Sequence, residues 1–329
     1  MPPKTTLREL LKKKQVFAPA IWDCMSARAA EICGFDAMVL ASSVFAWSHA
    51  GIPDFGLLTL DEVAGAAERI TAACSLPLVI DGEDGFGSTP LHVYRSCKRL
   101  VQAGVQGIMI DDQPPIRGGE RAYIMGEPGG PRPNPEWFTN KPPRVSTEVY
   151  LERIKAAVDA TKGTDCLIIA RTRVCGKGES FDESLYRAKK AMELGAEMAQ
   201  IGIQYWQDTY PICKKINDVI PGWKVYGDLY SKDGVPDISM DDLKSLGFNF
   251  VGIHCFSYGA FYGMVDFGKH NVQNRSSVYS DSHPRGGKWL EDEVRLMEDY
   301  YSKSWLGEEK IIKETAKQAA EEIEKGIFR

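Results

Sequence analysis

The residues best suited to chemistry in this chain are carboxylates that directly follow two apolar runs. Leu78–Ile80 leads into Asp81 and Glu83, and Ile108–Ile110 leads into Asp111. Hard divalent cations such as Mg²⁺ bind oxygen ligands, and carboxylates two residues apart on a strand end share one ion if the strand bends at the glycine between them. Acids also occur as ordinary turn formers after buried strands. Their repetition at two consecutive strand ends favours a divalent-metal site.

Apolar runs alternate with amphipathic stretches along the chain, which is typical of strand–helix units and a parallel sheet. Thr59 and Ser239 mark helix starts, because each precedes acids in a first helical turn. Glycines that end helices precede the next strands, at Gly34, Gly104, Gly195 and Gly247. Eight such units predict a (β/α)₈ barrel rather than an open doubly wound sheet. The predicted strands are Val16–Trp22, Ala37–Ser42, Leu78–Ile80, Gly107–Ile110, Leu167–Thr172, Met198–Ile203, Lys224–Leu229 and Phe250–His254.

Composition and charge exclude several classes of partner. The chain has 329 residues with 43% hydrophobic content, and a net charge of −5 that is spread along it. The absence of a basic stripe argues against nucleic acid. No apolar run is long enough to span a membrane, and residues 1–14 are polar and basic without a signal-peptide core. We therefore expect a cytoplasmic protein that binds neither nucleic acid nor membranes.

The eight cysteines form no CxxC pair and mostly lie in apolar helix or strand contexts. This usage indicates reduced packing residues. Cys175 is the one that lies near a strand exit, which leaves a catalytic thiol as an alternative role, although no partner base marks it.

In a (β/α)₈ barrel the active site gathers at the carboxyl ends of the strands, so each strand's exit residues are candidates. An acidic cluster faced by an arginine suits a substrate with carboxylate or phosphonate groups. Arg171 could equally form a structural ion pair, but its place opposite two acidic strand ends favours ligand binding. In strand order the exit residues are Asp23, Ser42 and Ser43, Asp81 and Glu83, Asp111, Arg171 and Arg173, Gln204, Asp228, and His254.

Four segments in a fixed order resemble the isocitrate lyase and phosphoenolpyruvate mutase superfamily over about residues 7–260. They are FAPAIWD at Phe17–Asp23 with the following Ser26–Arg28, GIPDFG at Gly51–Gly56, DGEDGFG at Asp81–Gly87 and IART at Ile169–Thr172. They resemble, respectively, that family's first strand and helix, its GLPD segment, its DxDxGYG signature and its IARTD strand. The resemblance implies the same barrel fold.

The resemblance also implies roles for individual residues. Asp81 would coordinate Mg²⁺ directly, with Mn²⁺ as a possible substitute, while Asp54, Glu83 and Asp111 would hold metal-bound waters. Ser42, Ser43 and Arg171 would bind the α-oxycarboxylate end of the substrate. At the last two strand exits, Asp228 and His254 complete the predicted substrate-binding set, although His254 could equally be a packing residue.

The chain departs from the family pattern at several positions. Glu83 stands where the family commonly has Asp, and Asp111 where it has Glu. The first side chain is therefore one methylene longer than in the family, and the second is one methylene shorter. The KKCGH-type loop, whose cysteine is the general acid of the carbon–carbon lyases, is absent, as is the EDKxxxxxNS pattern of the mutases. Gly202 stands where lyases have glutamate and mutases histidine. Neither well-known branch is matched.

The long segment 114–144 is rich in Pro, Gly and Arg and shows no periodicity. Loops of this length in a compact barrel are usually functional lids or disordered. We expect this segment to be a lid, with Glu120 or Tyr123 supplying the proton in place of the missing cysteine. A solvated face or a subunit contact is the alternative.

The predicted domains are a catalytic barrel over residues 1–275, which includes the lid, and a helical extension over residues 276–329. The sequence from Lys288 to Arg329 predicts two charged amphipathic helices, which a barrel does not require. In the family such helices are exchanged between neighbouring subunits. The resemblance therefore implies a homo-oligomer, either a dimer or a dimer of dimers.

The predicted function is that of a Mg²⁺-dependent lyase that makes or breaks a carbon–carbon bond in a small 2-hydroxy or 2-oxo di- or tricarboxylic acid. A phosphonopyruvate-type carbon–phosphorus enzyme is the first alternative, with Asp54 as nucleophile or water positioner. A decarboxylase or hydrolase of oxaloacetate-type acids is the second. A barrel kept only for binding is the non-enzyme alternative, and the intact acids argue against it.

Overall fold

The computed structural model describes residues 5–54, 56–87, 89–114, 144–172, 181–202 and 209–282, together with the single positions 295, 317, 318, 321 and 325. The chain divides into two compact units, Met1–Ala260 and Phe261–Arg329. The first unit holds every strand found among these described residues and every candidate site residue described below.

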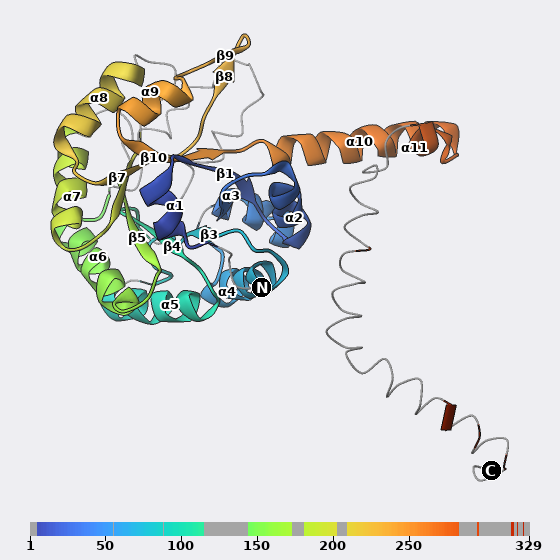
Figure 1. Cartoon of the computed structure of the whole chain (residues 1–329), viewed down its shortest axis with the longest axis horizontal. Helices are drawn as coiled ribbons and strands as arrows, with labels where there is room; N and C mark the ends of the chain where they lie inside the picture. Colours follow the sequence, from blue (N-terminus) through green and yellow to red (C-terminus); the bar gives the residue numbers. More distant parts are fainter. Residues whose placement is uncertain are drawn as a thin grey trace. The chain divides into compact units, whose positions relative to one another are not determined.

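Eight parallel strands of the first unit close into a barrel, with the order β1-β10-β7-β6-β5-β4-β3-β2 around the ring (Figure 1). Each strand pairs in parallel with the next, for example Asp111 of β4 with Arg171 of β5. The predicted (β/α)₈ fold is confirmed. The barrel strands are β1 (Val16–Ile21), β2 (Met38–Leu40), β3 (Leu78–Asp81), β4 (Gly107–Asp111), β5 (Leu167–Thr172), β6 (Met198–Ile201), β7 (Trp223–Tyr226) and β10 (Phe248–Ile253).

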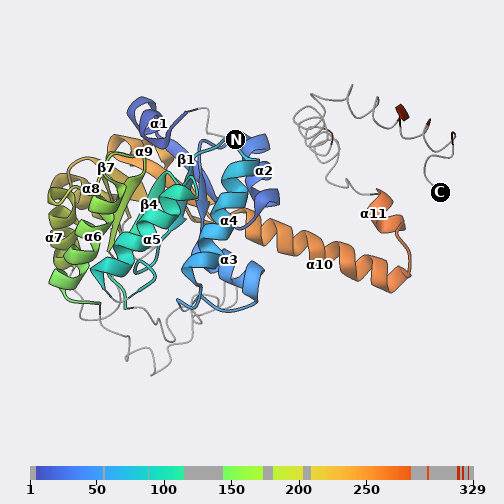
Figure 2. The same cartoon turned by 90° about the horizontal axis from the view of Figure 1, so that it is seen from below.

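Helices that connect successive strands surround the barrel (Figures 1 and 2). Apolar side chains on their inner faces pack against the outer faces of the strands, as Ile70 of α4, Leu100 of α5 and Ile154 of α6 do in one continuous core. The helices of this ring are α2 (Cys24–Cys33), α4 (Leu60–Ala73), α5 (Pro90–Gln102), α6 (Thr147–Thr161), α7 (Phe181–Glu193), α8 (Thr209–Val219) and α9 (Met240–Ser245).

Helix α1 (Leu7–Lys13) covers the amino-terminal end of the barrel (Figures 1 and 2). Thr6 and Glu9 form a reciprocal capping box that begins it. Leu7 and Leu11 are buried against the side chains that fill the barrel interior, and the Leu7 N–H donates to the Gln106 side-chain oxygen Oε1 at 2.7 Å. Because this end is closed, the opposite end at the strand carboxyl termini is the one left to bind ligands.

The helix signals in the sequence are confirmed. Thr59 forms a capping box with Glu62, and the Ser239 side chain caps α9 by accepting from the Asp242 N–H. The predicted helix-ending glycines have left-handed φ angles between 73° and 107°. That backbone conformation is the one glycine adopts without steric cost. These glycines are Gly34, Gly104, Gly195 and Gly247.

Three short elements are additional to the predicted pattern. Ser42 begins a helical turn, α3 (Ser42–Phe45), where a strand end was predicted, and a π-helical turn, η1 (Ala46–Ala50), follows it. A small antiparallel hairpin, β8 (Ser231–Lys232) with β9 (Val235–Pro236), stands between β7 and α9. These elements are too short to produce a periodic apolar pattern, and so sequence periodicity does not predict them.

Helix α10 (Phe256–Asn274) crosses from the first unit into the second, where α11 (Val278–Ser282) follows. Neither helix buries a residue, although α10 carries large apolar side chains. Among the described residues, no helix is both long and apolar enough to cross a membrane. The exposed apolar side chains of these helices are Tyr258, Phe261, Tyr262, Met264, Val265, Val272 and Val278.

Candidate active site

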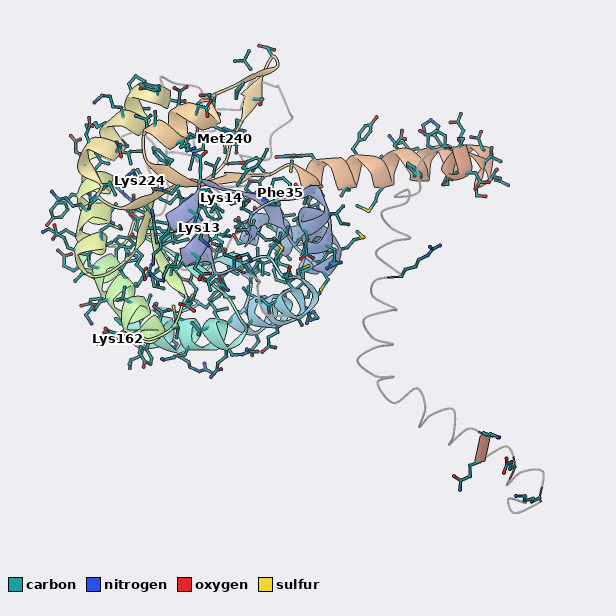
Figure 3. The ribbon with its side chains drawn as sticks, viewed as in Figure 1. Lys13, Lys14, Phe35, Lys162, Lys224 and Met240 are labelled. Carbon is teal, nitrogen blue, oxygen red and sulfur yellow. The ribbon has the colours of Figure 1, made fainter. Side chains whose placement is uncertain are left out.

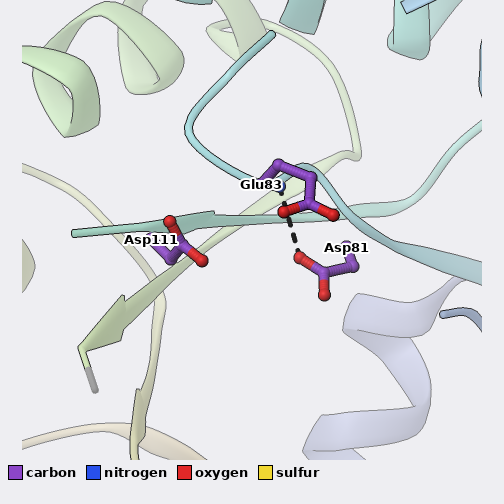
Figure 4. A group of neighbouring side chains, drawn as sticks. All are labelled: Asp81, Glu83 and Asp111. Carbon is purple, nitrogen blue, oxygen red and sulfur yellow. Dashed lines mark hydrogen bonds between the residues drawn. The ribbon is translucent and has the colours of Figure 1, made fainter. Parts of the chain in front are cut away.

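Asp81, Glu83 and Asp111 converge at the carboxyl ends of the adjacent strands β3 and β4 (Figure 4). One carboxylate oxygen from each lies within 4.8 Å of the others, and all three residues are buried. Buried carboxylates that share a site repel one another unless a cation or a proton neutralises them. An all-oxygen donor set of this kind suits Mg²⁺ or Mn²⁺. The three acids predicted from the two strand ends therefore lie close enough together to share one ion.

The backbone after β3 bends sharply to bring Glu83 back toward Asp81. A Cβ atom on Gly82 would lie 2.6 Å from the Met109 carbonyl oxygen and 2.8 Å from Ile108 Cγ2, so only glycine fits there. Glu83 adopts a left-handed φ of 57°, which is unusual for a residue with a side chain. Its N–H donates to Asp81 Oδ1 at 3.2 Å, and its carbonyl accepts from the Asp111 N–H at 2.8 Å. The bend thus joins the acidic ends of both strands.

Asp84 is a further acid of this turn, and no role was predicted for it from the sequence. It is buried, and its Oδ2 has no hydrogen-bond partner among the described residues. Burial raises the pKa of the Asp84 carboxyl to about 6, the Arg153 charge lowers it, and the Asp111 charge raises it further. The DGED sequence could have indicated a fourth acid, but only the fold shows that it is buried.

Asp81 also contacts two residues from other strand exits. Arg171 of β5 donates from Nη1 to Asp81 Oδ2 at 2.8 Å, and the Ser42 hydroxyl donates to the same oxygen at 3.0 Å. Ser42 Oγ lies 3.5 Å from Asp54 Oδ2, and Asp54 is itself buried. Because a hydroxyl has one proton, the shorter contact to Asp81 is the better hydrogen bond. The predicted residues Ser42, Asp54, Asp81 and Arg171 thus form one connected group.

A pocket opens at this end of the barrel, with an empty volume of about 520 Å³ that includes solvent at its mouth. Asp81, Arg171, Ser43 and His254 reach it from different strand exits, and alanines and glycines make up much of the remaining wall. Small side chains leave room for a ligand, and a few convergent polar groups orient it. The lining residues are Ala18, Ala20, Val39, Ala41, Ser43, Asp81, Met109, Arg171, Gln200, Val225, Gly227, Phe250, Gly252, Ile253 and His254.

His254 and Asp228 lie side by side at the exits of β10 and β7. The Asp228 carboxylate accepts from the His254 backbone N–H at 3.1 Å, and its Oδ2 lies 2.9 Å from the ring atom Nδ1. The ring N–H is not aligned for a hydrogen bond in this conformation, so the second contact is one of proximity. His254 lines the pocket, whereas Asp228 stands behind it.

Three arginines contact the exit of β4, and no role was predicted for them from the sequence. Arg153 of α6 donates from Nη1 to the carbonyl of Gln113 at 2.7 Å and lies 3.4 Å from that of Asp111. Arg144 and Arg187 lie 3.5 Å and 3.3 Å from the fully buried carboxylate of Asp112. These contacts fix the backbone that carries Asp111. Only the fold brings them together, because they come from distant parts of the chain.

Several predicted residues lie outside the described ranges. Glu120 and Tyr123, the candidate proton donors, are among them, as are Cys175 and nearly all of the predicted lid at 114–144. Gly202 lies within the described residues. Its N–H donates to the Thr172 carbonyl at 2.7 Å, so a backbone hydrogen bond links the exits of β6 and β5 at this position.

The barrel and the acidic cluster at its strand ends define the class as a (β/α)₈ protein with a candidate metal site. A family model described as phosphoenolpyruvate phosphomutase matches residues 7–266. The chain belongs to that family, within the superfamily of phosphoenolpyruvate mutase and isocitrate lyase, which confirms the resemblance carried by the sequence motifs.

The chain is similar in sequence to two lyases and in fold to a further solved structure. It is 32% identical over 262 residues to a 2,3-dimethylmalate lyase of Eubacterium barkeri, a match that covers 79% of this chain and 83% of that protein. It is 37% identical over 172 residues to the 2-methylisocitrate lyase of Escherichia coli strain K12, covering 52% of each. A solved structure of oxaloacetate acetylhydrolase matches with a TM-score of 0.74 at 20% identity, covering 93% of this chain and 99% of that one. That last likeness concerns the fold.

Proposed function

We propose that this protein is a Mg²⁺-dependent lyase that makes or breaks a carbon–carbon bond in a small 2-hydroxy or 2-oxo di- or tricarboxylic acid. The observation that carries the proposal is the buried cluster of Asp81, Glu83 and Asp111 at the mouth of the barrel, with Arg171 in contact with Asp81 at the pocket wall. The relatives named as 2,3-dimethylmalate lyase and 2-methylisocitrate lyase support the same reaction class.

The residues of the cluster fit a hard divalent ion, because all the donors are oxygens and their combined charge needs a cation. Asp81, Glu83 and Asp111 would hold Mg²⁺ or Mn²⁺, directly or through water. When bound, such an ion supplies Lewis-acid stabilisation for negative charge that develops on a substrate oxygen.

The protein's own side chains would bind and orient the substrate. The Arg171 guanidinium has a planar set of donors that matches a carboxylate, and it reaches the pocket together with the Ser43 side chain. The pocket, whose empty volume of about 520 Å³ includes solvent at its mouth, is large enough for a small acid. Buried surroundings exclude water around these charged groups, which strengthens their interactions with an anionic ligand.

Carbon–phosphorus chemistry is the second candidate, supported by the name of the matching family model. A specific observation favours it: Asp54 is a buried carboxylate within 3.5 Å of Ser42 Oγ and close to the acidic cluster, as a nucleophile or water positioner would need to be. A decarboxylase or hydrolase of oxaloacetate-type acids stays a further alternative within the same reaction family.

One screen separates these candidates. The purified protein is incubated with Mg²⁺ and a panel of 2-hydroxy acids, 2-oxo acids and phosphonates, and products are followed by release of 2-oxo acid and by phosphorus NMR. A lyase releases a 2-oxo acid fragment from a 2-hydroxy di- or tricarboxylate. Conversion of a phosphonate to a phosphate or a phosphate ester supports the second candidate instead. Failure to convert any member of the panel would contradict both.

We further propose that the protein is a homo-oligomer, a dimer or a dimer of dimers, whose helical extension packs on a neighbouring subunit. Helix α10 has no buried residue, and its exposed apolar side chains, such as Phe261, Tyr262 and Met264, support this proposal, because exposed apolar surface commonly marks an interface. Light scattering of the wild type and of a variant with Phe261→Ser and Met264→Ser tests it. Equal masses at the monomer value for both would contradict it.

We also propose a cytoplasmic location for the enzyme. The support is that the described cysteines are free thiols, including the exposed Cys33. Fractionation of the source cells with an antibody against the protein tests this directly.

A further inference from the structure

The loop connections after β7 and β10 build a histidine–aspartate pair at the mouth of the barrel. These strands are neighbours in the ring, and the Leu229 N–H donates to the Gly252 carbonyl at 2.9 Å beyond the end of β7. The Asp228 carboxylate accepts from the backbone N–H of His254 at 3.1 Å. Contacts of backbone groups therefore position both residues independently of the imidazole ring.

The ring of His254 has Asp228 close to Nδ1, and the residue lines the pocket. Nδ1 is a buried atom 2.9 Å from Asp228 Oδ2, and the side chain of Asp228 is 11% exposed. A rotation of the ring would turn this proximity into a hydrogen bond, and contacts of this kind commonly tighten only when substrate binds. Among the described residues, Nε2 makes no hydrogen bond, and His254 lines the pocket.

The closed strand order places the pair across the barrel mouth from the acidic cluster. β10 is four strands from β4 in either direction around the ring, and β7 is four strands from β3. His254 therefore stands opposite the strand of Asp111, and Asp228 opposite the strand of Asp81. A small acid held at Asp81 and Arg171 by one end would extend its other carbon atoms toward His254, because all three residues line the same pocket.

We propose that His254 is the proton donor to the carbon atom freed by carbon–carbon cleavage, and that Asp228 is the residue that positions its ring. The assignment rests on the proposed lyase function. It gives the reaction a proton donor within the described residues, although the family's cysteine loop is absent from the chain.

The chemical step balances as follows. The 2-hydroxyl group of the substrate loses its proton to a water molecule, and the electrons of the broken O–H bond form the new carbonyl group. The bond between carbon 2 and carbon 3 breaks, and its electron pair stays on carbon 3 as an enolate of the departing carboxylic acid. The imidazolium of His254 transfers its Nε2 proton to carbon 3, and the neutral ring regains a proton from water. One proton is released and one taken up, and no oxidant or reductant is needed.

Few charged side chains of the described residues lie beside His254. Asp228 faces it from β7, while Asp81 of β3 and Arg171 of β5 share the pocket wall with it, and the neighbouring β1 contributes Ala18 and Ala20. Asp228 would hold a proton on Nδ1, as the buried carboxylate does in other histidine–aspartate pairs. Nε2 would then carry the proton that is transferred.

The test compares steady-state kinetics of the wild type, His254→Gln, His254→Ala and His270→Gln on an acid that the wild type cleaves. His270 is a matched control, because its Nδ1 also lies near an aspartate, 3.5 Å from Asp266 Oδ1, but it is on α10 outside the pocket. We expect His254→Gln to lower kcat by roughly 10²- to 10⁴-fold with KM changed less than about threefold. Added imidazole should partly restore kcat in His254→Ala, and His270→Gln should behave like the wild type.

A separate readout tests the positioning role of Asp228 without turnover. In protein labelled with ¹⁵N-histidine, the nitrogen shifts of His254, assigned by their loss in His254→Gln, should report a protonated Nδ1 in the wild type and a different distribution of the ring protons in Asp228→Asn. Asp228→Glu should retain more kcat than Asp228→Asn. Unchanged shifts in Asp228→Asn would overturn the positioning role.

The outcomes separate this assignment from the proposed function. If the wild type cleaves an acid and His254→Gln keeps its kcat while KM rises, His254 only binds an anionic group and the assignment falls alone. If kcat instead falls in Tyr123→Phe or Glu120→Gln but not in His254→Gln, the proton comes from the long loop and the assignment also falls. A wild type that cleaves no acid overturns the lyase proposal and this assignment together.

Discussion

The Arg171 guanidinium lies 2.8 Å from Asp81 Oδ2, so the carboxylate expected to bind metal already has a cationic partner within the protein. The two side chains come from strands on either side of β4 and are largely buried. The same Asp81 oxygen accepts a hydrogen bond from the Ser42 hydroxyl. A divalent ion must therefore share Asp81 with Arg171 or displace it. An anionic substrate would then pair with the Arg171 guanidinium in place of Asp81.

We expect Arg171→Gln to separate metal binding from ligand binding. Without the competing cation, Mg²⁺ should bind at least as tightly as to the wild type, while oxalate, used as a simple dicarboxylate probe, should bind about tenfold or more weakly to the Mg²⁺ form. Isothermal titration with each ligand measures both effects. Arg8→Gln is the matched control, since it removes the ion pair with Glu197 near the first helix. Loss of Mg²⁺ binding in Arg171→Gln would assign Arg171 to the structure of the cluster instead.

Asp81→Asn should weaken Mg²⁺ binding by roughly 10- to 100-fold and remove most turnover, because a neutral amide replaces an anionic ligand to a hard cation. Titration with Mn²⁺ followed by electron paramagnetic resonance measures the binding. Asp233→Asn makes the same chemical change in the exposed hairpin turn, where a left-handed φ of 53° suits asparagine, and should change neither property. Near-normal turnover of Asp81→Asn at limiting Mg²⁺ would remove Asp81 from the metal site.

Gly82→Ala tests whether the bend after β3 is needed to assemble the cluster. The added Cβ would overlap the Met109 carbonyl oxygen, so the backbone must shift at a cost of about 1–3 kcal/mol, and Glu83 should move away from Asp81. Urea unfolding and Mg²⁺ titration report the two effects. Gly65→Ala is the control, because a Cβ there meets no atom closer than 3.5 Å and alanine favours the helix by up to about 1 kcal/mol. Full Mg²⁺ affinity in Gly82→Ala would show that the bend can relax without loss of the site.

Lys224 should make folding stability depend on alkaline pH. It is 3% exposed on β7, and burial lowers the pKa of its ammonium below the ordinary value of 10.5 (Figure 3). Between the two pKa values the unfolded chain binds more protons than the folded chain, so the free energy of unfolding rises with pH in that window. Lys224→Met should lack this rise in urea-unfolding measurements, while Lys162→Met at an exposed helix end should retain it. Parallel pH profiles for the wild type and Lys224→Met would contradict the prediction.

Thiol reactivity should follow burial. Burial raises the pKa of the Cys74, Cys97 and Cys213 thiols to about 12, so each is protonated and shielded in the folded protein. Cys33 is exposed. Alkylation with iodoacetamide at pH 8, mapped by mass spectrometry, should label Cys33 first and the three buried cysteines only after unfolding. Early labelling of Cys97, which has no exposed surface, would indicate that the helix ring opens in the native state.

The sequence by itself was sufficient for the barrel and for the acids that mark its active end. Strand and helix periodicities repeat locally, and Thr59, Ser239 and the glycine after each helix act within a few residues of their own position. The acids Asp81 and Asp111 follow their strands directly, so their location at one end of a parallel barrel required no knowledge of distant contacts.

The tertiary structure decided how these residues meet. Closure of the barrel brings Arg171 of β5 to Asp81 of β3, with β4 between the two strands. It also brings Asp228, after β7, to His254, after the neighbouring β10. The register of the strands sets which atoms of each pair lie close together. Burial raises the pKa of Asp84, which has the same chemistry in the sequence as any turn acid. Contacts between distant segments depend on the summed packing of the whole barrel, whereas strand ends and helix caps depend on local backbone geometry, and only local geometry is encoded in short patterns.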